Sequence, residues 1–346
     1  MKAGVFLGPG IAEVREWPDP VVGPGQVKVK IAYAGICGSD VESLNHRMGF
    51  QRAGLNFNGT APGRTGAVVE GHEATGTIVE VGPGLKGDWQ VGQRVVLSLK
   101  AACGACYYCR TKRESNCEHP SRPSGAFAEY AIYPEGTLFA LPDAVSFELA
   151  ALTEPTSIGV HAVDCAGIRN GQTLAISGAG TIGLVTLAVA LHAGACKVLV
   201  SEPIASKREI ALGMGADVAI DPLSEDLAAA AARLTDGRGL DAVIEASGNL
   251  GAATQMPELL DKGGTLVWTG VYPYNAEIPV QPFQMYLKEL TIRSTMGAPY
   301  CFQRALNLLP KLNIGSLVTN IYPLDAFAEA FNNHEKGQSI KTLIKM

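Results

Sequence analysis

Four cysteines crowd the stretch CGACYYCRTKRESNC with the spacing C-x2-C-x2-C-x7-C, and they are Cys103, Cys106, Cys109 and Cys117. Four thiolates can surround a zinc ion tetrahedrally, and four protein ligands leave no open position for a substrate. The alternatives are free or disulfide-paired cysteines, or an iron–sulfur cluster, although nothing nearby suggests an electron-transfer partner. The spacing therefore predicts a structural zinc site in a lobe at about residues 100–118.

A second set of residues could hold a metal ion with an exchangeable position. GICGSD contains Cys37 and Ser39, VVEGHE contains His72 and Glu73, and LTEPTSIGVHA contains Glu154. A cysteine, a histidine and one or two carboxylates suit a catalytic zinc. Spacing alone does not establish this site, because a buried cysteine is usually an inert hydrophobe and a lone histidine is usually structural.

The glycine-rich segment SGAGTIG follows the strand-like TLAI and opens a long apolar helix. It contains Gly178, Gly180 and Gly183 in a G-x-G-x-x-G pattern, with Thr181 and Ile182 before the last glycine. The first glycine permits a tight turn, the second lets a pyrophosphate approach, and the third lets helix and strand pack closely. The context predicts a dinucleotide-binding loop. The alternative is a glycine-rich turn of another α/β protein.

An acidic residue, Glu202, ends the next predicted strand, KVLVSE. Its carboxylate would accept hydrogen bonds from the adenosine ribose and repel a 2′-phosphate, so NAD is favoured over NADP. Lys207 and Arg208 follow closely and would soften that preference.

The elements that would position these residues change in rhythm along the chain. Short β-like runs such as QVKVKIAYAGI, TGTIVEVGPG and FAEYAIYP fill the first 150 residues or so. From about Thr173, apolar strands alternate with helical segments, which predicts a parallel sheet covered on both faces in an α/β fold. LAAAAARL (227–234) is expected to be a surface helix. After about Leu290 the elements shorten and end in IKTLIKM, an expected edge strand.

Composition excludes several classes of protein. The formal net charge is −5, from 28 basic and 33 acidic residues, and argues against a nucleic-acid or anionic-membrane partner. No run of eighteen apolar residues predicts a membrane span, and MKAGVFLGPGIAEVREW has no long apolar segment of a signal peptide. A cytoplasmic location is expected, where clustered cysteines more often bind metal than pair.

Taken together, these motifs resemble the zinc-dependent medium-chain dehydrogenase family. Within it, the polyol and vicinal-diol branch, which includes sorbitol and butanediol dehydrogenases, is most similar. The resemblance spans nearly the whole chain, through ICGSD, GHE-x-x-G, the four-cysteine lobe, FAEY, EP-x-x-x-G-VHA and GAGTIG in that order. It implies a GroES-like catalytic domain at 1–150, a Rossmann NAD-binding domain at 151–290, and a C-terminal return at 291–346 that completes the catalytic domain.

The resemblance also implies roles for single residues. Cys37, His72 and Glu73 would surround the catalytic zinc, Glu154 would bind it directly or through water, and Ser39 would belong to a proton relay. On the Rossmann side, the expected cofactor contacts are Ile182, Glu202 and Lys207, with Gly270, Val271 and Tyr272 in a loop against the nicotinamide. Each chain would then hold two zinc ions, one catalytic and one structural, and NAD.

The implied activity is hydride transfer between NAD(H) and a secondary alcohol of a polyol, cyclitol or sugar, with the ketone as product. Alternatives are a short vicinal-diol or sugar-alcohol-phosphate dehydrogenase, a zinc-free reductase of the same superfamily, and a non-catalytic nucleotide-binding relative. The expected partners are a small polyhydroxy substrate and further copies of the chain, as a dimer or tetramer.

Three departures from the sorbitol pattern put the substrate in doubt. A histidine commonly found five residues after the zinc cysteine is Glu42 here, and a glycine-rich segment, 47–66, is added before His72. A charged substrate-side residue is replaced near Thr295, Met296 and Gly297. His46 would either replace the missing relay histidine or be a surface-loop residue.

Overall fold

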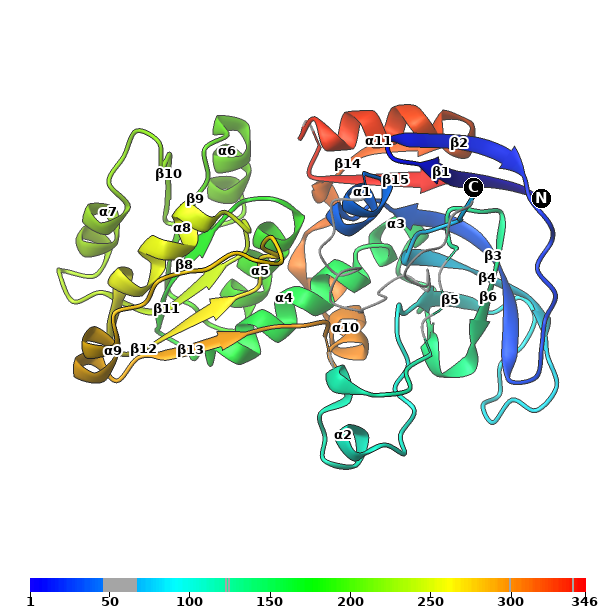
Figure 1. The fold of residues 1–346 in the computed structure, drawn as a ribbon, viewed down its shortest axis with the longest axis horizontal. Coiled ribbons are helices and arrows are strands. Elements are labelled where there is room, and N and C mark those ends of the chain that lie inside the picture. Colours follow the sequence, from blue (N-terminus) through cyan, green and yellow to red (C-terminus); the bar gives the residue numbers. More distant parts are fainter. Residues whose placement is uncertain (46–66, 122, 124, 299, 338) are drawn as a thin grey trace. The chain divides into compact units, whose positions relative to one another are not determined.

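A computed structural model describes residues 1–45, 67–121, 123, 125–298, 300–337 and 339–346. His46 and the 47–66 segment lie outside the described residues. The chain divides into two compact units (Figure 1). Unit 1 comprises Met1–Glu154, Leu306–Pro310 and Ile314–Met346, and unit 2 comprises Pro155–Ala305 and Lys311–Asn313.

Unit 1 is rich in β-structure. Its strands are β1 (Lys2–Gly8), β2 (Ile11–Glu16), β3 (Gln26–Gly35), β4 (Glu73–Val81), β5 (Arg94–Leu97), β6 (Tyr130–Pro134), β7 (Leu138–Ala140), β14 (Val318–Pro323) and β15 (Lys341–Lys345). Its helices are α1 (Gly38–Leu44), α2 (Tyr107–Arg110), α3 (Phe147–Ala150) and α11 (Phe327–Glu335). Two further helices, α4 (Thr153–Ala166) and α10 (Phe302–Leu312), contain the unit boundaries.

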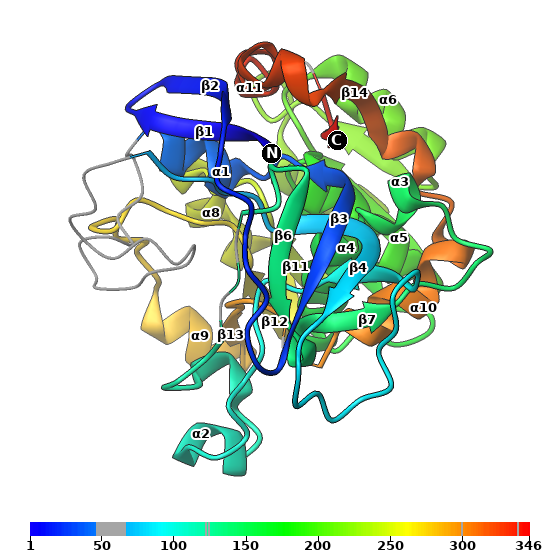
Figure 2. The same ribbon diagram turned by 90° about the vertical axis from the view of Figure 1, so that its right-hand side faces the viewer.

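Strand β3 organises the main sheet of unit 1. It pairs with β4 along one edge and with β6 along the other (Figure 2). Beyond β6, the same edge pairs with β15. The sheet order is β14-β15-β3-β4-β5-β7, with β6 also on β3. Val27, Val29 and Ile31 alternate along β3 and are buried, as expected of a strand with one face on the core.

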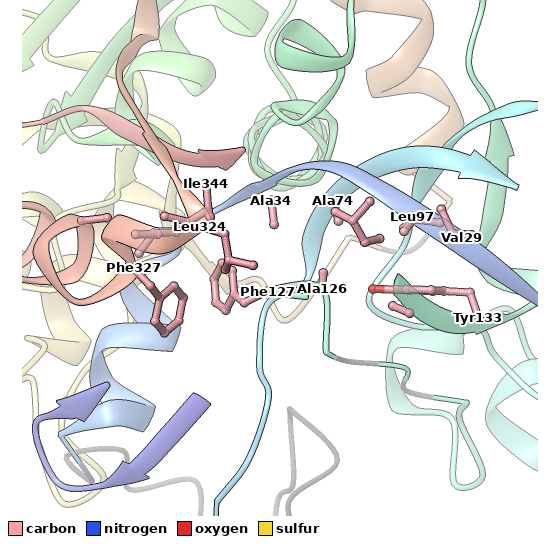
Figure 3. Packing of buried hydrophobic residues seen from close by; sticks show 14 of the residues in the cluster. Val29, Ala34, Ala74, Leu97, Ala126, Phe127, Tyr133, Leu324, Phe327 and Ile344 are labelled. Carbon is pink, nitrogen blue, oxygen red and sulfur yellow. The ribbon is translucent and has the colours of Figure 1, made fainter. Parts of the chain in front are cut away.

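The two ends of the chain share the core of unit 1. Phe6 stacks on Phe327 with ring centroids 5.9 Å apart. Phe127, Leu324 and Ile344 belong to the same buried cluster (Figure 3). The prediction that IKTLIKM forms an edge strand is wrong. Strand β15 lies inside the sheet, because β14 pairs with one edge and β3 with the other. Strand β3 comes from a distant part of the chain, so local sequence could not reveal this pairing.

Unit 2 alternates strands and helices. Its strands are β8 (Thr173–Ser177), β9 (Lys197–Ser201), β10 (Val218–Ile220), β11 (Leu240–Glu245), β12 (Leu260–Trp268) and β13 (Thr291–Ser294). Its other helices are α5 (Thr181–His192), α6 (Ala205–Gly213), α7 (Leu227–Leu234), α8 (Leu250–Gln255) and α9 (Pro282–Lys288), which lie alongside the sheet in Figure 1.

The sheet of unit 2 is parallel and has the order β10-β9-β8-β11-β12-β13. The predicted α/β class with a parallel sheet is confirmed. The order reverses beside β8, so β8 and β11 flank the point where open α/β sheets bind their ligands. The sheet continues through β13, beyond residue 290. Across the described residues, no helix is long and apolar enough to cross a membrane.

Candidate functional site

The pairing of β3 with β4 brings three predicted metal ligands together. Gly35 at the end of β3 pairs with Glu73 at the start of β4, so Cys37 lies beside His72 and Glu73. One ligand atom from each of these three residues lies within 4.8 Å of the other two. A Cβ at Gly35 would lie 2.1 Å from Glu73 Oε2, so only glycine leaves room for this carboxylate. Among the described residues, the set offers sulfur, nitrogen and oxygen donors and has fewer than four ligands, as a catalytic zinc with an open position requires.

Asp40 supports two of these ligands, and sequence reasoning missed it. Its Oδ2 accepts a hydrogen bond from the backbone N–H of Cys37 at 2.9 Å, and its Oδ1 lies 3.3 Å from His72 Nδ1. Burial opposes the charged form of His72, but the nearby charges of Asp40 and Cys37 outweigh burial and raise the pKa of His72 well above its usual value. A carboxylate on Nδ1 fixes the ring and leaves Nε2 for a metal ion.

Lys341 is the second neighbour that sequence reasoning missed. It lies at the start of β15, and its ammonium group donates to both oxygens of Glu73, at 2.6 and 2.8 Å. Both side chains are buried, with exposed fractions of 2% and 1%. No local signal marks Lys341, because 268 residues separate it from Glu73.

Glu154 and Ser39 lie near this set but outside the three-ligand group of the described residues. Glu154, in the first turn of α4, is partly buried. Burial raises the pKa of Glu154 to about 7; the charges of Glu73 and Asp40 act in the same direction, and those of His72 and Lys341 oppose it. Ser39 is partly buried in the first turn of α1.

The four-cysteine lobe has the geometry of a closed zinc site. The sulfur–sulfur distances are 3.5 Å for Cys106 and Cys109, 3.9 Å for Cys103 and Cys109, and 4.0 Å for Cys106 and Cys117. Four sulfurs at the ~2.3 Å zinc–sulfur distance lie about 3.8 Å apart on a tetrahedron. Backbone N–H groups of Glu118 and Cys109 lower the pKa of Cys106 to about 6, which favours the thiolate that a metal ion needs.

The glycine loop between β8 and α5 has the backbone that its pattern predicts. Gly178 has φ of +92°, a conformation that favours glycine. A Cβ at Gly183 would lie 1.9 Å from the carbonyl oxygen of Gly178, whereas one at Gly180 would meet nothing within 4 Å. The third glycine therefore permits close packing, and the second leaves the backbone open at the N-terminus of α5, where Thr181 and Ile182 begin the helix. A phosphate group would fit there.

Glu202 ties this loop to the strand beside it. It follows β9, and its carboxylate accepts hydrogen bonds from the backbone N–H groups of Ala179 and Ile204 at 2.8 and 3.0 Å. Arg208 donates to the carbonyl oxygens of Glu202 and Pro203 at 2.7 Å each. Lys207 lies beside Arg208 in α6 and is partly buried.

The loop after β12 lies at the same edge of the sheet. Glu245, which ends β11 and is fully buried, pairs in register with Ser177 of β8 and Trp268 of β12. Its carboxylate accepts hydrogen bonds from the Tyr272 hydroxyl and from the backbone of Gly248. Gly270 packs on this carboxylate, since a Cβ there would lie 2.5 Å from Glu245 Oε2. Val271 is exposed. The sequence did not reveal that Glu245 holds this loop in place through its hydrogen bonds.

Two family models match the chain. The alcohol dehydrogenase GroES-like domain matches residues 23–143, and the zinc-binding dehydrogenase model matches residues 181–311. Together they cover the candidate metal centres of unit 1 and much of unit 2, including the start of α5.

Three curated relatives are 33% identical to the chain. D-arabitol-phosphate dehydrogenase of Enterococcus avium aligns over 92% of this chain and 90% of its own. L-threonine 3-dehydrogenase of Pyrococcus horikoshii aligns over 97% and 95%, and sorbitol dehydrogenase of Halalkalibacterium halodurans over 97% and 96%.

Two solved structures share the fold over the whole chain. A putative zinc-binding dehydrogenase from Sinorhizobium meliloti bound to NADP has a TM-score of 0.90 at 30% identity, covering 100% of this chain and 99% of that one. The 2R,3R-butanediol dehydrogenase from Bacillus subtilis has a TM-score of 0.87 at 28% identity, with the same coverage.

Proposed function

The chain belongs to the zinc-dependent medium-chain alcohol dehydrogenase family, and we propose that it interconverts a secondary alcohol of a polyol, cyclitol or sugar with the corresponding ketone, using NAD(H). When bound, zinc would favour the deprotonated form of a substrate hydroxyl as a Lewis acid, and the nicotinamide would accept the hydride. The chain supplies the ligands, the orientation and the path for the proton.

The observation that carries the proposal is the contrast between the two candidate metal centres. Four thiols, those of Cys103, Cys106, Cys109 and Cys117, close one site. In the part of the chain that the structure describes, the other site has three ligands, Cys37, His72 and Glu73, and is incomplete. Only the incomplete site has room for a substrate oxygen. Two zinc ions for each chain follow from this proposal.

The other residues of unit 1 would support the reaction. Asp40 would hold His72 with Nε2 toward the metal ion, through its position beside Nδ1. Ser39 would pass the alcohol proton outward. Glu154 would bind the metal ion directly or through water. In unit 2, Gly178, Gly180 and Gly183 would hold the pyrophosphate of NAD at the N-terminus of α5.

The substrate class is supported by the relatives. The similarity to sorbitol dehydrogenase supports a free polyol as the substrate, and the similarity to D-arabitol-phosphate dehydrogenase supports a phosphorylated polyol. Butanediol dehydrogenase supports a short vicinal diol and L-threonine 3-dehydrogenase a hydroxy amino acid. Each class contains a secondary alcohol, so the proposed chemistry at the metal site is the same for all of them.

A substrate panel tests the proposal. NAD reduction is followed by absorbance with linear polyols, cyclitols, sugars, vicinal diols, sugar-alcohol phosphates and L-threonine. We expect turnover of a polyhydroxy compound, and loss of at least ~100-fold in kcat/KM with Cys37→Ser, which removes a thiolate ligand. Cys196→Ser is the control, since Cys196 is exposed and its contact with the Gly171 carbonyl can be kept by a hydroxyl. Full activity of Cys37→Ser would reject the site.

Glu202 is proposed to favour NAD over NADP by repelling a 2′-phosphate. We expect a higher kcat/KM with NAD, and a preference reduced by about tenfold in Glu202→Gln, which corresponds to ~1.4 kcal/mol. This change keeps an oxygen acceptor for one of the two backbone N–H groups and removes the charge. Glu225→Gln is a matched control, because Glu225 also accepts a backbone N–H, from Asp221, at 2.9 Å. A wild-type preference for NADP would contradict the assignment.

We further propose that unit 1 is the catalytic domain and that unit 2, which includes β13 and so extends past residue 290, is the NAD-binding domain of a cytoplasmic homo-oligomer, a dimer or a tetramer. A reducing compartment suits the clustered thiols. Support for self-association comes from exposed apolar side chains around α9 and β13: Val271, Tyr274, Val280, Phe283, Tyr286, Leu287, Met296 and Tyr300. Strand β13 is also the last strand of its sheet.

A further inference from the structure

The loop after β12, residues 269–272, is tied at both of its ends to one residue, Glu245. At its start, the backbone N–H groups of Thr269 and Gly270 donate to the carbonyl oxygen of Glu245 at 2.8 and 2.9 Å. At its end, the Tyr272 hydroxyl donates to Oε2 of the Glu245 carboxylate. Val271 lies between these anchors with an exposed side chain. A single buried residue therefore holds the whole loop.

The same carboxylate holds the turn after β11, residues 246–248. Its Oε1 accepts hydrogen bonds from the backbone N–H groups of Ser247 at 2.8 Å and Gly248 at 3.1 Å, and from the Ser247 hydroxyl. Glu245 is fully buried, so these donors and the Tyr272 hydroxyl take the place of water around its charge. One oxygen thus serves the turn, and the other reaches the loop after β12.

Close backbone packing links these two segments to the glycine loop. A Cβ at Gly178 would lie 3.0 Å from the Cα of Ser247, and one at Gly248 would lie 2.7 Å from the carbonyl oxygen of Val271. All of these residues belong to unit 2. A continuous series of contacts therefore runs from the glycine loop, through Ser247 and Glu245, to the loop after β12.

Tyr272 was expected to contact the cofactor, but its hydroxyl is already used within the protein. Burial and the hydrogen bond to Glu245 raise the pKa of Tyr272, so the hydroxyl keeps its proton and donates it to the carboxylate. A phenol has one donor, and the carboxylate occupies it. The side chain of Tyr272 is therefore directed to the support of the loop.

We propose that Tyr272 is a positioning residue whose bond to Glu245 holds the loop after β12 in the conformation that receives the nicotinamide of NAD. This inference rests on the proposed function, because it requires NAD in unit 2. A loop that is already ordered loses less entropy when its ligand binds, so the ligand binds more tightly. ADP-ribose lacks only the nicotinamide and should bind equally well whether or not the loop is held.

The direct test compares these two ligands by isothermal titration calorimetry on the zinc-loaded protein. In Tyr272→Phe, we expect the Kd for NAD to rise about tenfold, which corresponds to ~1.4 kcal/mol, and the Kd for ADP-ribose to stay within about twofold. A merely structural role predicts a different pattern, since general damage to unit 2 weakens both ligands alike. Equal losses for both ligands, or an unchanged Kd for NAD, would overturn the inference.

Tyr33→Phe is the matched control. The Tyr33 hydroxyl also donates to a carboxylate, that of Glu148, at 2.6 Å, but both residues belong to unit 1. This variant loses the same kind of bond, and its ratio of NAD to ADP-ribose affinity should equal that of the unchanged protein. A change in this ratio as large as that in Tyr272→Phe would show that the effect is not specific to the loop, and would reject the inference.

Should Tyr272→Phe fail to fold, Glu245→Gln and Glu245→Gln/Tyr272→Phe carry the test. The amide removes the buried charge, so loss of the hydroxyl no longer leaves a carboxylate without one of its donors. The amide N–H can still bond to the Tyr272 oxygen. Removal of the hydroxyl in this background should again weaken NAD about tenfold and leave ADP-ribose within about twofold. An unchanged Kd for NAD between the two variants contradicts the proposed role.

The outcomes separate this inference from the proposed function. An NAD-dependent dehydrogenase whose Tyr272→Phe variant keeps the normal ratio of NAD to ADP-ribose affinity rejects the inference alone. A protein that binds neither NAD nor ADP-ribose and oxidises no alcohol rejects both.

Discussion

Gly35 contributes to the candidate metal site by having no side chain. A Cβ at Gly35 would lie 2.1 Å from Glu73 Oε2, so the carboxylate of Glu73 occupies the space that this atom would fill. Glu73 in turn receives the ammonium group of Lys341, so a displaced Glu73 would disturb a ligand and an ion pair together.

We expect Gly35→Ala to lower zinc content at the catalytic site and to reduce kcat/KM by about 10–100-fold, the range for loss of a ligand's supporting contact. Metal analysis and steady-state kinetics measure both effects. Gly38→Ala is the control, because a Cβ at Gly38 would meet nothing within 4 Å. Full zinc content and activity in Gly35→Ala would show that Glu73 has room to move.

Local motifs could predict the candidate ligands but not all of their supports. The sequence position of Asp40 could have indicated its role, because an acidic residue three positions after Cys37, at the start of a helix, can accept the Cys37 backbone N–H, and Asp40 does so. Lys341 had none. IKTLIKM contains two lysines four residues apart, and only contacts with distant residues, such as the one between Lys341 and Glu73, distinguish the buried Lys341 from the exposed Lys345.

At the scale of elements, the lobe around α2 depends on its sulfur ligands more than on a core. Tyr107 and the turns on either side of α2 are largely exposed, and two of the four cysteines, Cys109 and Cys117, are buried. With few apolar side chains available to bury, the proposed structural zinc would supply most of the folding free energy of this lobe.

We expect Cys106→Ser to lower stability and to spare the chemistry of the folded fraction, because it opens the closed site. A fall in Tm of ~5 °C or more would follow, since each ~1 kcal/mol shifts the Tm of a domain of this size by about 2–4 °C. Differential scanning fluorimetry measures it, with Cys196→Ser as the control. Complete loss of activity in a fully folded variant would contradict the division between the two sites.

Elements with a clear local sequence pattern could be predicted, whereas the position of an element in its sheet could not when its partner strand was distant in sequence. The sequence predicted the strands and helices at TLAIS, TIGLVTLAVALH, KVLVS and LAAAAARL, and the structure has β8, α5, β9 and α7 there. Parallel strands buried on both faces give continuous apolar runs, which local reading recognises. Strand β15 was also expected, but its place inside the sheet depended on β3 and β14.

At the scale of the whole molecule, the exposed apolar side chains around α9 bear on self-association. No residue of α9 is buried, and Phe283 and Tyr286 are 67% and 77% exposed. Aromatic side chains of this kind often dominate the binding energy of an interface.

Phe283→Asp together with Tyr286→Asp should weaken self-association at least ~30-fold, which corresponds to about 2 kcal/mol for one dominant contact. Sedimentation velocity across a concentration series measures the change. Leu223→Asp is the control, because Leu223 is equally exposed but lies before α7, outside the α9 and β13 segments. An unchanged oligomer would mean that copies associate through another surface.

The chain begins and ends in unit 1, and this affects how the protein is made. All four cysteines of the lobe leave the ribosome by residue 117, whereas Lys341 emerges 268 residues after Glu73. At ~5–20 residues per second, that interval lasts on the order of tens of seconds. The Glu73 carboxylate therefore waits for its ammonium partner until unit 2 and β14 have been made.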